Sequence, residues 1–176
     1  MTQDQLIQKC LKQDRKAQKV LYERFGPTMK MVCLRYLFEK DLAEEVMNQG
    51  FLKVFSRLDS YGNNGSFEGW IRRIMVNQCL DQNRKKGSQN GSITAVEDWE
   101  ISHPSSIEAH HDLKFILWVI ESLPMGLKTI FNLIEIEGFS HKEVSEELGI
   151  TESASRSQLS RAKKILKEKL QSVRVK

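Results

Sequence analysis

Hydrophobic residues recur along most of this chain with the three-to-four-residue period of an amphipathic helix, whereas the period-two alternation that marks strands is not sustained. The pattern predicts an all-α protein. Glycine and proline mark several breaks between helices, for example Gly26-Pro27 and Pro124. The predicted helices cover residues 6–25, 28–38, 41–58, 67–86, 112–123, 125–137, 140–148 and 151–170.

The stretch between the fourth and fifth predicted helices has the composition of a linker. It reads GSQNGSITAVEDWEISHPSS (residues 87–106) and is rich in glycine, serine and acidic residues but poor in aliphatic ones. Such a segment buries too little apolar surface to offset the entropy lost on ordering. We therefore predict two small helical domains, at residues 1–90 and 111–176, joined by a flexible acidic linker at residues 91–110.

Residues 140–170 predict a helix-turn-helix motif. Ser140 is followed three residues later by Glu143, the spacing of a capping box in which both side chains accept backbone N–H groups. Gly149 suits the positive φ at which many helices end, and Thr151 can cap the helix that follows. Two helices joined by a short turn with a glycine are typical of this motif.

The last predicted helix separates into an apolar face and a face of serines and basic residues. Short serines let a helix enter the major groove, arginine bonds guanine in bidentate fashion, and lysines meet phosphates. A solvated basic face is the alternative that charge alone favours. The capping box, the glycine turn and the serines together favour DNA recognition instead. The predicted DNA-binding residues here are Ser153, Arg156, Ser157, Ser160, Arg161, Lys164 and Lys167.

Charge is distributed in two basic lobes around an acidic strip, within a formal net charge of +4. Residues 1–90 carry 16 Lys and Arg against 10 Asp and Glu, and residues 113–176 carry 11 against 8. Residues 91–112 carry five acids and no Lys or Arg. Because the basic lobes coincide with the predicted domains, the pattern indicates two modules that bind one polyanion.

The predicted helix 41–58 has one apolar residue, Leu52, inside its outward polar face. An isolated exposed leucine is often without a role, yet an apolar centre with a polar rim is also typical of a protein-protein contact. The pattern alone leaves both interpretations open. The outward face is formed by Asp41, Glu45, Gln49, Leu52 and Lys53.

The predicted helix 67–86 is apolar around much of its circumference and has one polar stripe that ends in basic residues. The turn before it is rich in amides. A flexible amide-rich loop beside a basic stripe can hold an extruded base, whereas an ordinary surface loop and a structural helix are the alternative. The residues concerned are Tyr61, Asn63, Asn64 and Ser66 in the turn, and Arg73, Asn77, Arg84 and Lys85 on the helix.

Nothing in the sequence indicates an enzyme. The four histidines lack the spacing of a metal site, and no glycine-rich loop follows a strand. The three cysteines lie far apart among apolar residues, so we predict buried free thiols. We predict no catalytic residue, metal, cofactor or small-molecule substrate. No apolar run approaches the roughly 20 residues of a membrane span, which favours a cytoplasmic protein without membrane insertion.

Four stretches together resemble the extracytoplasmic-function (ECF) sigma factors of the bacterial sigma-70 class. The first three are DRKAQKVLYERFGPTMKMVCLRYL (14–37), AEEVMNQGFLKVFSRLDSY (43–61) and SFEGWIRRIMVNQCLDQNRKK (66–86). The fourth is LPMGLKTIFNLIEIEGFSHKEVSEELGITESASRSQLSRAKKIL (123–166). The last stretch alone is shared with other regulators, but the ordered set is specific to sigma factors. The resemblance implies a subunit of RNA polymerase that is not itself an enzyme.

The resemblance also implies partners for each predicted surface. The face around Leu52 would dock on the β′ clamp of core polymerase, and the turn and stripe of residues 59–86 would bind the promoter −10 element. The C-terminal domain would sit on the β flap and place helix 151–170 on the −35 element. The acidic linker would run toward the catalytic channel. An anti-sigma factor is the usual further partner of the family.

The chain departs from the family pattern in two places. Where many members have Gln-Glu or Gln-Asp in the clamp helix, this chain has Asn48-Gln49 followed by Gly50, which removes an acid and adds a helix-weakening residue. Ser155 stands where an apolar residue is common, so we expect a looser core there.

Two rival classes of protein remain open. Another two-domain helix-turn-helix regulator would explain residues 123–170 but not the constellation at residues 43–86. A helical adaptor without a DNA role would show no salt-sensitive, DNA-dependent activity.

Overall fold

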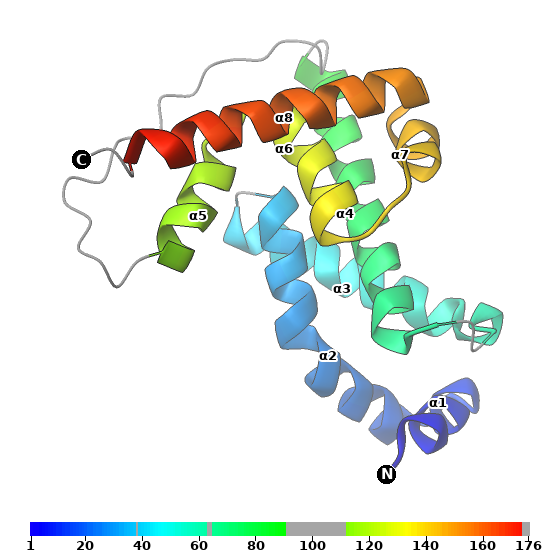
Figure 1. Cartoon of the computed structure of the whole chain (residues 1–176). Coiled ribbons are helices and arrows are strands. Elements are labelled where there is room, and N and C mark those ends of the chain that lie inside the picture. The colour runs from blue at the N-terminus through cyan, green and yellow to red at the C-terminus, as the bar shows by residue number, and fades with distance from the viewer. Residues whose placement is uncertain (38, 63–64, 91–111, 174–176) are drawn as a thin grey trace. The chain divides into compact units, whose positions relative to one another are not determined.

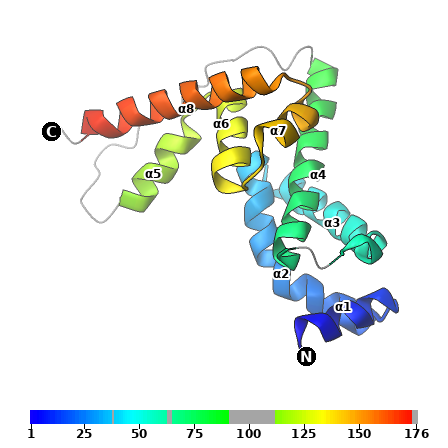
Figure 2. The ribbon, with the colours of Figure 1, turned by 45° about the vertical axis from the view of Figure 1, so that its right-hand side comes forward.

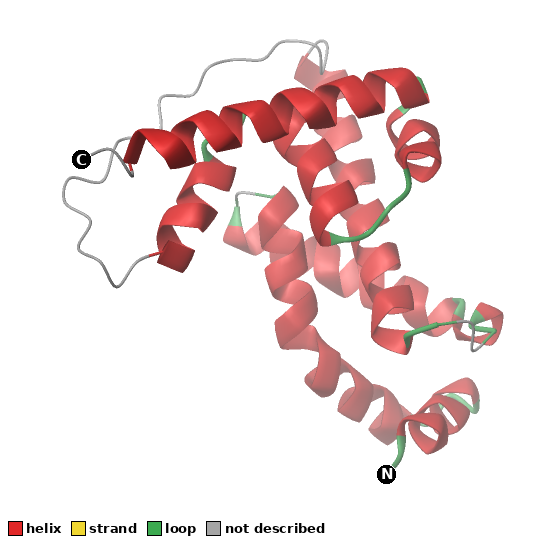
Figure 3. Cartoon of the chain, in the orientation of Figure 1, coloured by secondary structure: helices red, strands yellow, loops and turns green. Residues whose placement is uncertain are grey.

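The computed structural model describes residues 1–37, 39–62, 65–90 and 112–173, and every regular element in these ranges is a helix (Figure 1, Figure 3). The all-α prediction is therefore confirmed for the described part of the chain. The chain divides into two compact units, Met1–Gly91 and Ser92–Lys176. The predicted linker, residues 91–110, lies outside the described residues.

The first unit opens with two helices whose boundaries differ from those predicted. Helix α1 spans Gln3–Leu11 and α2 spans Arg15–Tyr36, so the break falls at residues 12–14. Gln13 takes a φ of 62° there. The side chain of Asp14 then caps α2, because its Oδ1 accepts hydrogen bonds from the backbone N–H of Lys16 at 2.8 Å and of Ala17 at 3.1 Å.

The predicted helix break at Gly26-Pro27 is wrong, because Pro27 lies inside α2. A proline within a helix removes the hydrogen bond to the carbonyl four residues earlier, here that of Glu23. The helix continues because its buried face extends on both sides of the proline. That face includes Leu21, Phe25, Met29 and Val32.

Helices α2, α3 (Lys40–Ser56) and α4 (Phe67–Asn90) pack on one another and form the core of the first unit (Figure 1, Figure 2). A short 3-10 turn, Leu58–Ser60, follows α3. Helix α4 runs four residues past the predicted end at residue 86 and includes the start of the stretch with linker composition. The largest fully buried side chains of this core are Phe51, Phe67, Leu6, Leu21, Met29, Ile71 and Met75.

The second unit contains α5 (Asp112–Glu121), α6 (Met125–Phe131), α7 (His141–Leu148) and α8 (Glu152–Val173). The predicted helix 125–137 is α6 followed by a π-helical turn, Asn132–Ile136. Helix α8 packs against α5, α6 and α7. The core is formed by Val119, Leu123, Leu127, Ala162 and Leu166.

Polar contacts brace this core at the corner between α5 and α6. The side chain of Lys128 is buried, and its Nζ lies 2.7 Å from Glu121 Oε2. Lys169 of α8 donates to the Ser122 Oγ at 2.7 Å. Charge pairing satisfies the buried ammonium group, which would otherwise be costly in this place.

Two further sequence predictions concern buried thiols and membrane spans. Cys10, Cys33 and Cys79 are buried free thiols, as predicted. The pKa of the Cys10 thiol is raised by burial and by the charge of Asp14. Within the described ranges, no helix has the length and hydropathy needed to cross a membrane.

Candidate nucleic-acid and protein interfaces

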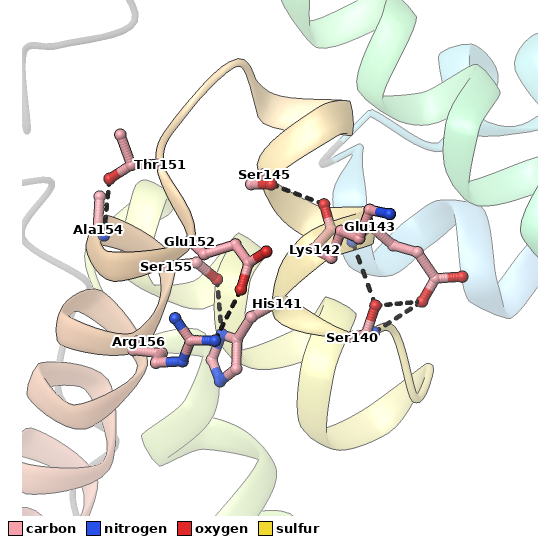
Figure 4. A network of polar contacts seen from close by, with 10 residues as sticks. All are labelled: Ser140, His141, Lys142, Glu143, Ser145, Thr151, Glu152, Ala154, Ser155 and Arg156. Atoms are coloured by element: carbon pink, nitrogen blue, oxygen red, sulfur yellow. Dashed lines mark hydrogen bonds and ion pairs between the residues drawn. The ribbon is translucent and has the colours of Figure 1, made fainter.

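The predicted capping box and glycine turn of the helix-turn-helix are present (Figure 4). The Ser140 N–H donates to Glu143 Oε2 at 2.8 Å, and the Glu143 N–H donates to Ser140 Oγ at 3.2 Å. Gly149 ends α7 in the left-handed region at a φ of 66°. Thr151 Oγ1 then accepts the N–H of Ala154 at 3.1 Å. These contacts therefore define the turn between the end of α7 and the start of α8.

Ser155 occupies the core position at which we expected looser packing. Its side chain is buried, with 0% exposure, and its Oγ lies 2.9 Å from Nδ1 of His141 (Figure 4). His141 is the first residue of α7, so this hydrogen bond links the start of the supporting helix to the first turns of α8. A polar link thus occupies the place of the usual apolar contact.

The outward face of α8 is open to solvent over its length. The helix contains 22 residues, which corresponds to about 33 Å at 1.5 Å per residue. The side chain of Arg156 is 58% exposed and pairs with Glu152 at 2.7 Å. The predicted DNA-binding residues Ser153, Arg156, Ser157, Ser160, Arg161, Lys164 and Lys167 are all exposed.

Two residues on this face were missed by the sequence reasoning. Glu152 pairs with Arg156, and Lys163 pairs with Glu135 of the π-helical turn at 2.7 Å. The spacing of four residues between Glu152 and Arg156 is a sequence signal for a helical ion pair. The sequence gives no signal for the contact between Glu135 and Lys163, because that contact depends on how α8 packs against α6 and the π-helical turn that follows it.

All the residues of the predicted protein-binding face of α3 are exposed. Leu52 has 70% of its surface exposed, more than the other exposed large hydrophobic residues in the described ranges, such as Met31 at 61%. Gln49 donates from Nε2 to Glu45 Oε1 at 3.1 Å, which orders the polar rim on one side of the leucine. The residues of this face, Asp41, Glu45, Gln49, Leu52 and Lys53, are all exposed. We call them the Leu52 face.

Contacts with α2 fix the edge of the Leu52 face. Lys30 Nζ lies 2.5 Å from Glu44 Oε2, and the Tyr22 hydroxyl donates to Asn48 Oδ1 at 2.9 Å. The hydrogen bond with Glu44 raises the pKa of Lys30, and the same bond lowers the pKa of Glu44. Asn48, one of the departures from the family pattern, thus ties α3 to α2.

Gly50, the other departure on α3, lies where α3 packs tightly against α4. The glycine is buried, and a Cβ at this position would lie 2.3 Å from Sδ of Met75 and 3.0 Å from its Cε. Met75 is itself fully buried. The glycine that weakens the helix in isolation therefore makes room for a large side chain from the neighbouring helix.

The polar stripe of α4 carries exposed basic side chains. Arg73, Arg84 and Lys85 are exposed, and Asn77 is partly buried. Arg84 also forms an ion pair with Asp81. The basic side chains of the predicted stripe are therefore exposed on α4, and the role of the stripe in binding DNA stays a prediction.

The turn before α4 is anchored by an aromatic cluster that the sequence reasoning missed. Tyr61 lies with its ring centroid 4.9 Å from that of Phe67 and 5.5 Å from that of Trp70, and its hydroxyl donates to the Gly65 carbonyl at 2.9 Å. Ser66 Oγ accepts the Gly69 N–H at 3.3 Å. The predicted residues Asn63 and Asn64 lie outside the described residues.

No group of three or more His, Cys, Asp and Glu side chains in the described ranges is arranged to hold a metal ion. The predicted surfaces on α3, α4 and α8 stay candidate interfaces.

Comparison with known families matches both units. The model for Sigma-70 region 2 matches residues 21–89, and the model for Sigma-70, region 4 matches residues 116–166. The ECF RNA polymerase sigma-E factor of Escherichia coli strain K12 is 27% identical over 183 aligned residues, which cover 97% of this chain and 95% of that protein. The factor of the same name from Haemophilus influenzae is 25% identical, with 97% and 96% covered.

Solved structures share the fold. The sigma factor RpoE of Bartonella quintana, in complex with the anti-sigma factor NepR, superposes with a TM-score of 0.54 at 23% identity, over 87% of this chain and 96% of that chain. CnrH, in complex with the cytosolic domain of CnrY, gives 0.51 at 17% identity over 95% and 96%.

Two helical units that match regions 2 and 4 in this order define a transcription-initiation protein rather than a regulator built on a helix-turn-helix alone. The chain belongs to the ECF group of RNA polymerase sigma factors in the sigma-70 family. Members of this family are not enzymes, which agrees with the prediction from the sequence that the chain is not one.

Proposed function

We propose that this sigma factor directs core polymerase to promoters through two DNA contacts, α8 on the −35 element and the stripe of α4 on the −10 element. The observation that carries the proposal is the exposed face of α8. Its serines, arginines and lysines point away from a buried apolar face, directly after a capped glycine turn. Such a helix can enter the major groove with its first turns and meet phosphates further along.

The −10 contact rests on α4 and the turn before it. Arg73, Arg84 and Lys85 offer positive charge along one side of the helix, while Asn77 offers an amide. Tyr61 and Ser66 remain part of the proposed contact. Each hydroxyl makes one hydrogen bond within the turn and keeps capacity for another. A base held by this turn would meet the amides of residues 63 and 64, which remain part of the proposal.

The Leu52 face is the proposed docking site for the β′ clamp of core polymerase. An exposed leucine with a polar rim of acids, an amide and a lysine is the composition of a small protein-protein contact. The β flap would take the second unit. We propose domain limits of 1–90 and 111–176, with residues 91–110 as the connection.

An anti-sigma factor is a proposed further partner. The sigma factor of Bartonella quintana that shares this fold was solved with the anti-sigma factor NepR. A protein that works on core polymerase and promoter DNA is expected in the cytoplasm, and it needs no cofactor or small-molecule substrate.

Run-off transcription tests the proposed function. Purified core polymerase is supplied with genomic fragments, with and without this protein, and start sites are mapped. We expect new start sites only when the protein is present. Absence of both polymerase binding and new start sites would contradict the proposal.

Substitution of Arg156 or Ser157 by alanine then tests the assignment of α8. We expect altered recognition of the −35 element while binding to core polymerase persists, because both side chains are exposed on the second unit. The readout is footprinting and promoter affinity across −35 variants, with co-purification of core as the control. Footprints and affinities that match those of the unsubstituted protein on every variant would contradict the assignment.

A further inference from the structure

An acidic residue opens the helix that is proposed to read DNA. Glu152 is the first residue of α8, and its side chain is 41% exposed. A carboxylate near DNA phosphates is repelled by them, so an acid at the tip of a recognition helix opposes binding unless something offsets its charge. Its presence on an otherwise basic and hydroxyl-rich face therefore calls for a physical reason.

Helix capping does not supply this reason. Thr151 already caps α8 through the hydrogen bond from the Ala154 N–H to its Oγ1 (Figure 4). A carboxylate in the first turn does interact favourably with the helix dipole, and this is the competing explanation for Glu152. The dipole, however, is satisfied by a carboxylate in any orientation.

The Glu152 carboxylate has a specific orientation, toward Arg156. Oε2 accepts a hydrogen bond from Nη2 of Arg156 at 2.7 Å, across one turn of the helix. The guanidinium has five N–H donors in a rigid fork, and this bond engages one of them. Because the arginine side chain stays 58% exposed, the remaining donors are open to a ligand.

We propose that Glu152 is a positioning residue that holds Arg156 ready to bond a guanine in the −35 element. This inference rests on the proposed role of α8 in DNA recognition. An arginine that is held in one rotamer loses less conformational freedom on binding. The carboxylate also neutralises Arg156 toward phosphates, so the pair favours a base edge, where hydrogen-bond geometry counts, over the backbone, where charge counts.

The test compares promoter libraries in which each −35 position is varied, using polymerase reconstituted with full-length protein. The variants are Glu152→Ala, Arg156→Ala and the combination of both. Glu168→Ala is the matched control, because it removes the other acid of α8 from an exposed position far from Arg156. Thermal unfolding of each variant measures separately how much Glu152 stabilises the fold through the dipole of α8.

We expect Glu152→Ala to reduce discrimination at the same base position as Arg156→Ala, by roughly 3- to 10-fold, as part of the larger loss from a bidentate contact. Affinity for DNA without a promoter is expected to rise, because one acid is gone. In the Arg156→Ala background, Glu152→Ala is expected to leave base preference unchanged. Glu152→Gln keeps a weaker hydrogen bond to Arg156, so its base discrimination is expected to lie between that of the natural protein and that of Glu152→Ala.

Three results separate the inference from the function on which it rests. If Glu152→Ala shifts affinity for all sequences equally, as Glu168→Ala does, Glu152 is only a solvated acid and the inference is wrong. The inference is also wrong if Glu152→Ala alters base preference equally with and without Arg156. If Arg156→Ala leaves every base preference intact, the proposed role of Arg156 in the −35 contact fails, and the inference falls with it.

Discussion

At the scale of single residues, Gly50 and Met75 show how a local cost is offset by packing. Glycine inside a helix is less favourable than alanine by about 1 kcal/mol. Here the missing Cβ leaves space for the Met75 thioether, which would otherwise lie 2.3 Å from it. Overpacking a core costs roughly 1–3 kcal/mol. Because Met75 is fully buried, we expect the clash to cost more than alanine would gain in helix propensity.

Gly50→Ala is therefore expected to lower the free energy of unfolding in the natural chain. In a Met75→Ala background the sign is expected to reverse, with a gain of about 1 kcal/mol, because the helix propensity of alanine then acts without the clash. Urea unfolding of the four proteins in this cycle measures the coupling. Equal effects of Gly50→Ala in both backgrounds would contradict the packing argument.

Asp14 carries the acid sensitivity of the first helix boundary. Its pKa is lowered chiefly by the backbone N–H of Ala17, with further lowering by the N–H of Lys16 and by the charges of Lys9 and Lys16. Since the pKa is lower in the folded state, the stabilisation is present above the ordinary aspartate pKa, near 4, and is lost as pH falls through the depressed value.

Asp14→Asn keeps a capping side chain but removes the titration. As the pH falls below about 4, the contribution of Asp14 disappears from the natural protein. We therefore expect the variant to lose less stability over this range than the natural protein does. Denaturant unfolding across this pH range is the measurement, and Asp4→Asn, an exposed acid of α1, is the control. A stability profile of Asp14→Asn that parallels that of the natural protein below pH 4 would exclude this role for the cap.

At the scale of elements, helix α3 has an inner face that packs and an outer face that we propose binds polymerase. Leu52→Asp places a charge at the centre of the Leu52 face, where a desolvated leucine would contact the clamp, so we expect core polymerase binding to fall by about tenfold or more. Fold stability should change little, because Leu52 is 70% exposed.

Met31→Asp is the matched control for this prediction, since Met31 is 61% exposed and lies on α2. Co-purification with core polymerase and a titrated affinity measure both variants. An equal loss from the two substitutions, or no loss from either, would contradict a docking site centred on Leu52.

Helix existence was predictable from periodicity, whereas several boundaries were not. The break at residues 12–14 has neither glycine nor proline, and a glutamine takes the positive φ there. Conversely, Pro27 signals a break, yet burial on both sides of it carries α2 onward. Tertiary packing overrides local signals in both places.

The candidate surfaces were predictable to the extent that they depend on one helix. The wheel of α8 places the seven predicted DNA-binding residues outward, and all seven are exposed. Contacts between helices, such as Ser155 with His141 and Gly50 with Met75, were not predictable because they depend on helix spacing. Of the departures from the family pattern, Gly50 and Ser155 acquire a structural reason only from these contacts.

At the scale of the whole molecule, each unit carries its own hydrophobic core. The first is built on α2, α3 and α4, and the second on α5, α6 and α8. A unit with a complete core is expected to fold alone. The two regions matched by family models also fall one in each unit.

Residues 1–90 and 111–176, produced separately, are therefore each expected to unfold cooperatively in denaturant. The first fragment should retain binding to core polymerase, and Leu52→Asp should weaken that binding as it does in the full chain. Circular dichroism and urea titration measure folding. A fragment that is helical only in the presence of the other would contradict the proposed domain limits.

The contact between Gly50 and Met75 has a consequence for the descent of this family. Positions 50 and 75 compete for one space in the core, so a larger residue at position 50 requires the Met75 side chain to move or to be replaced by a shorter one. A relative with alanine or a larger residue at the first position is expected to carry a short side chain at the second. The pair would then change together through evolution, independently of the outer face of the same helix, which its proposed contact with core polymerase would constrain.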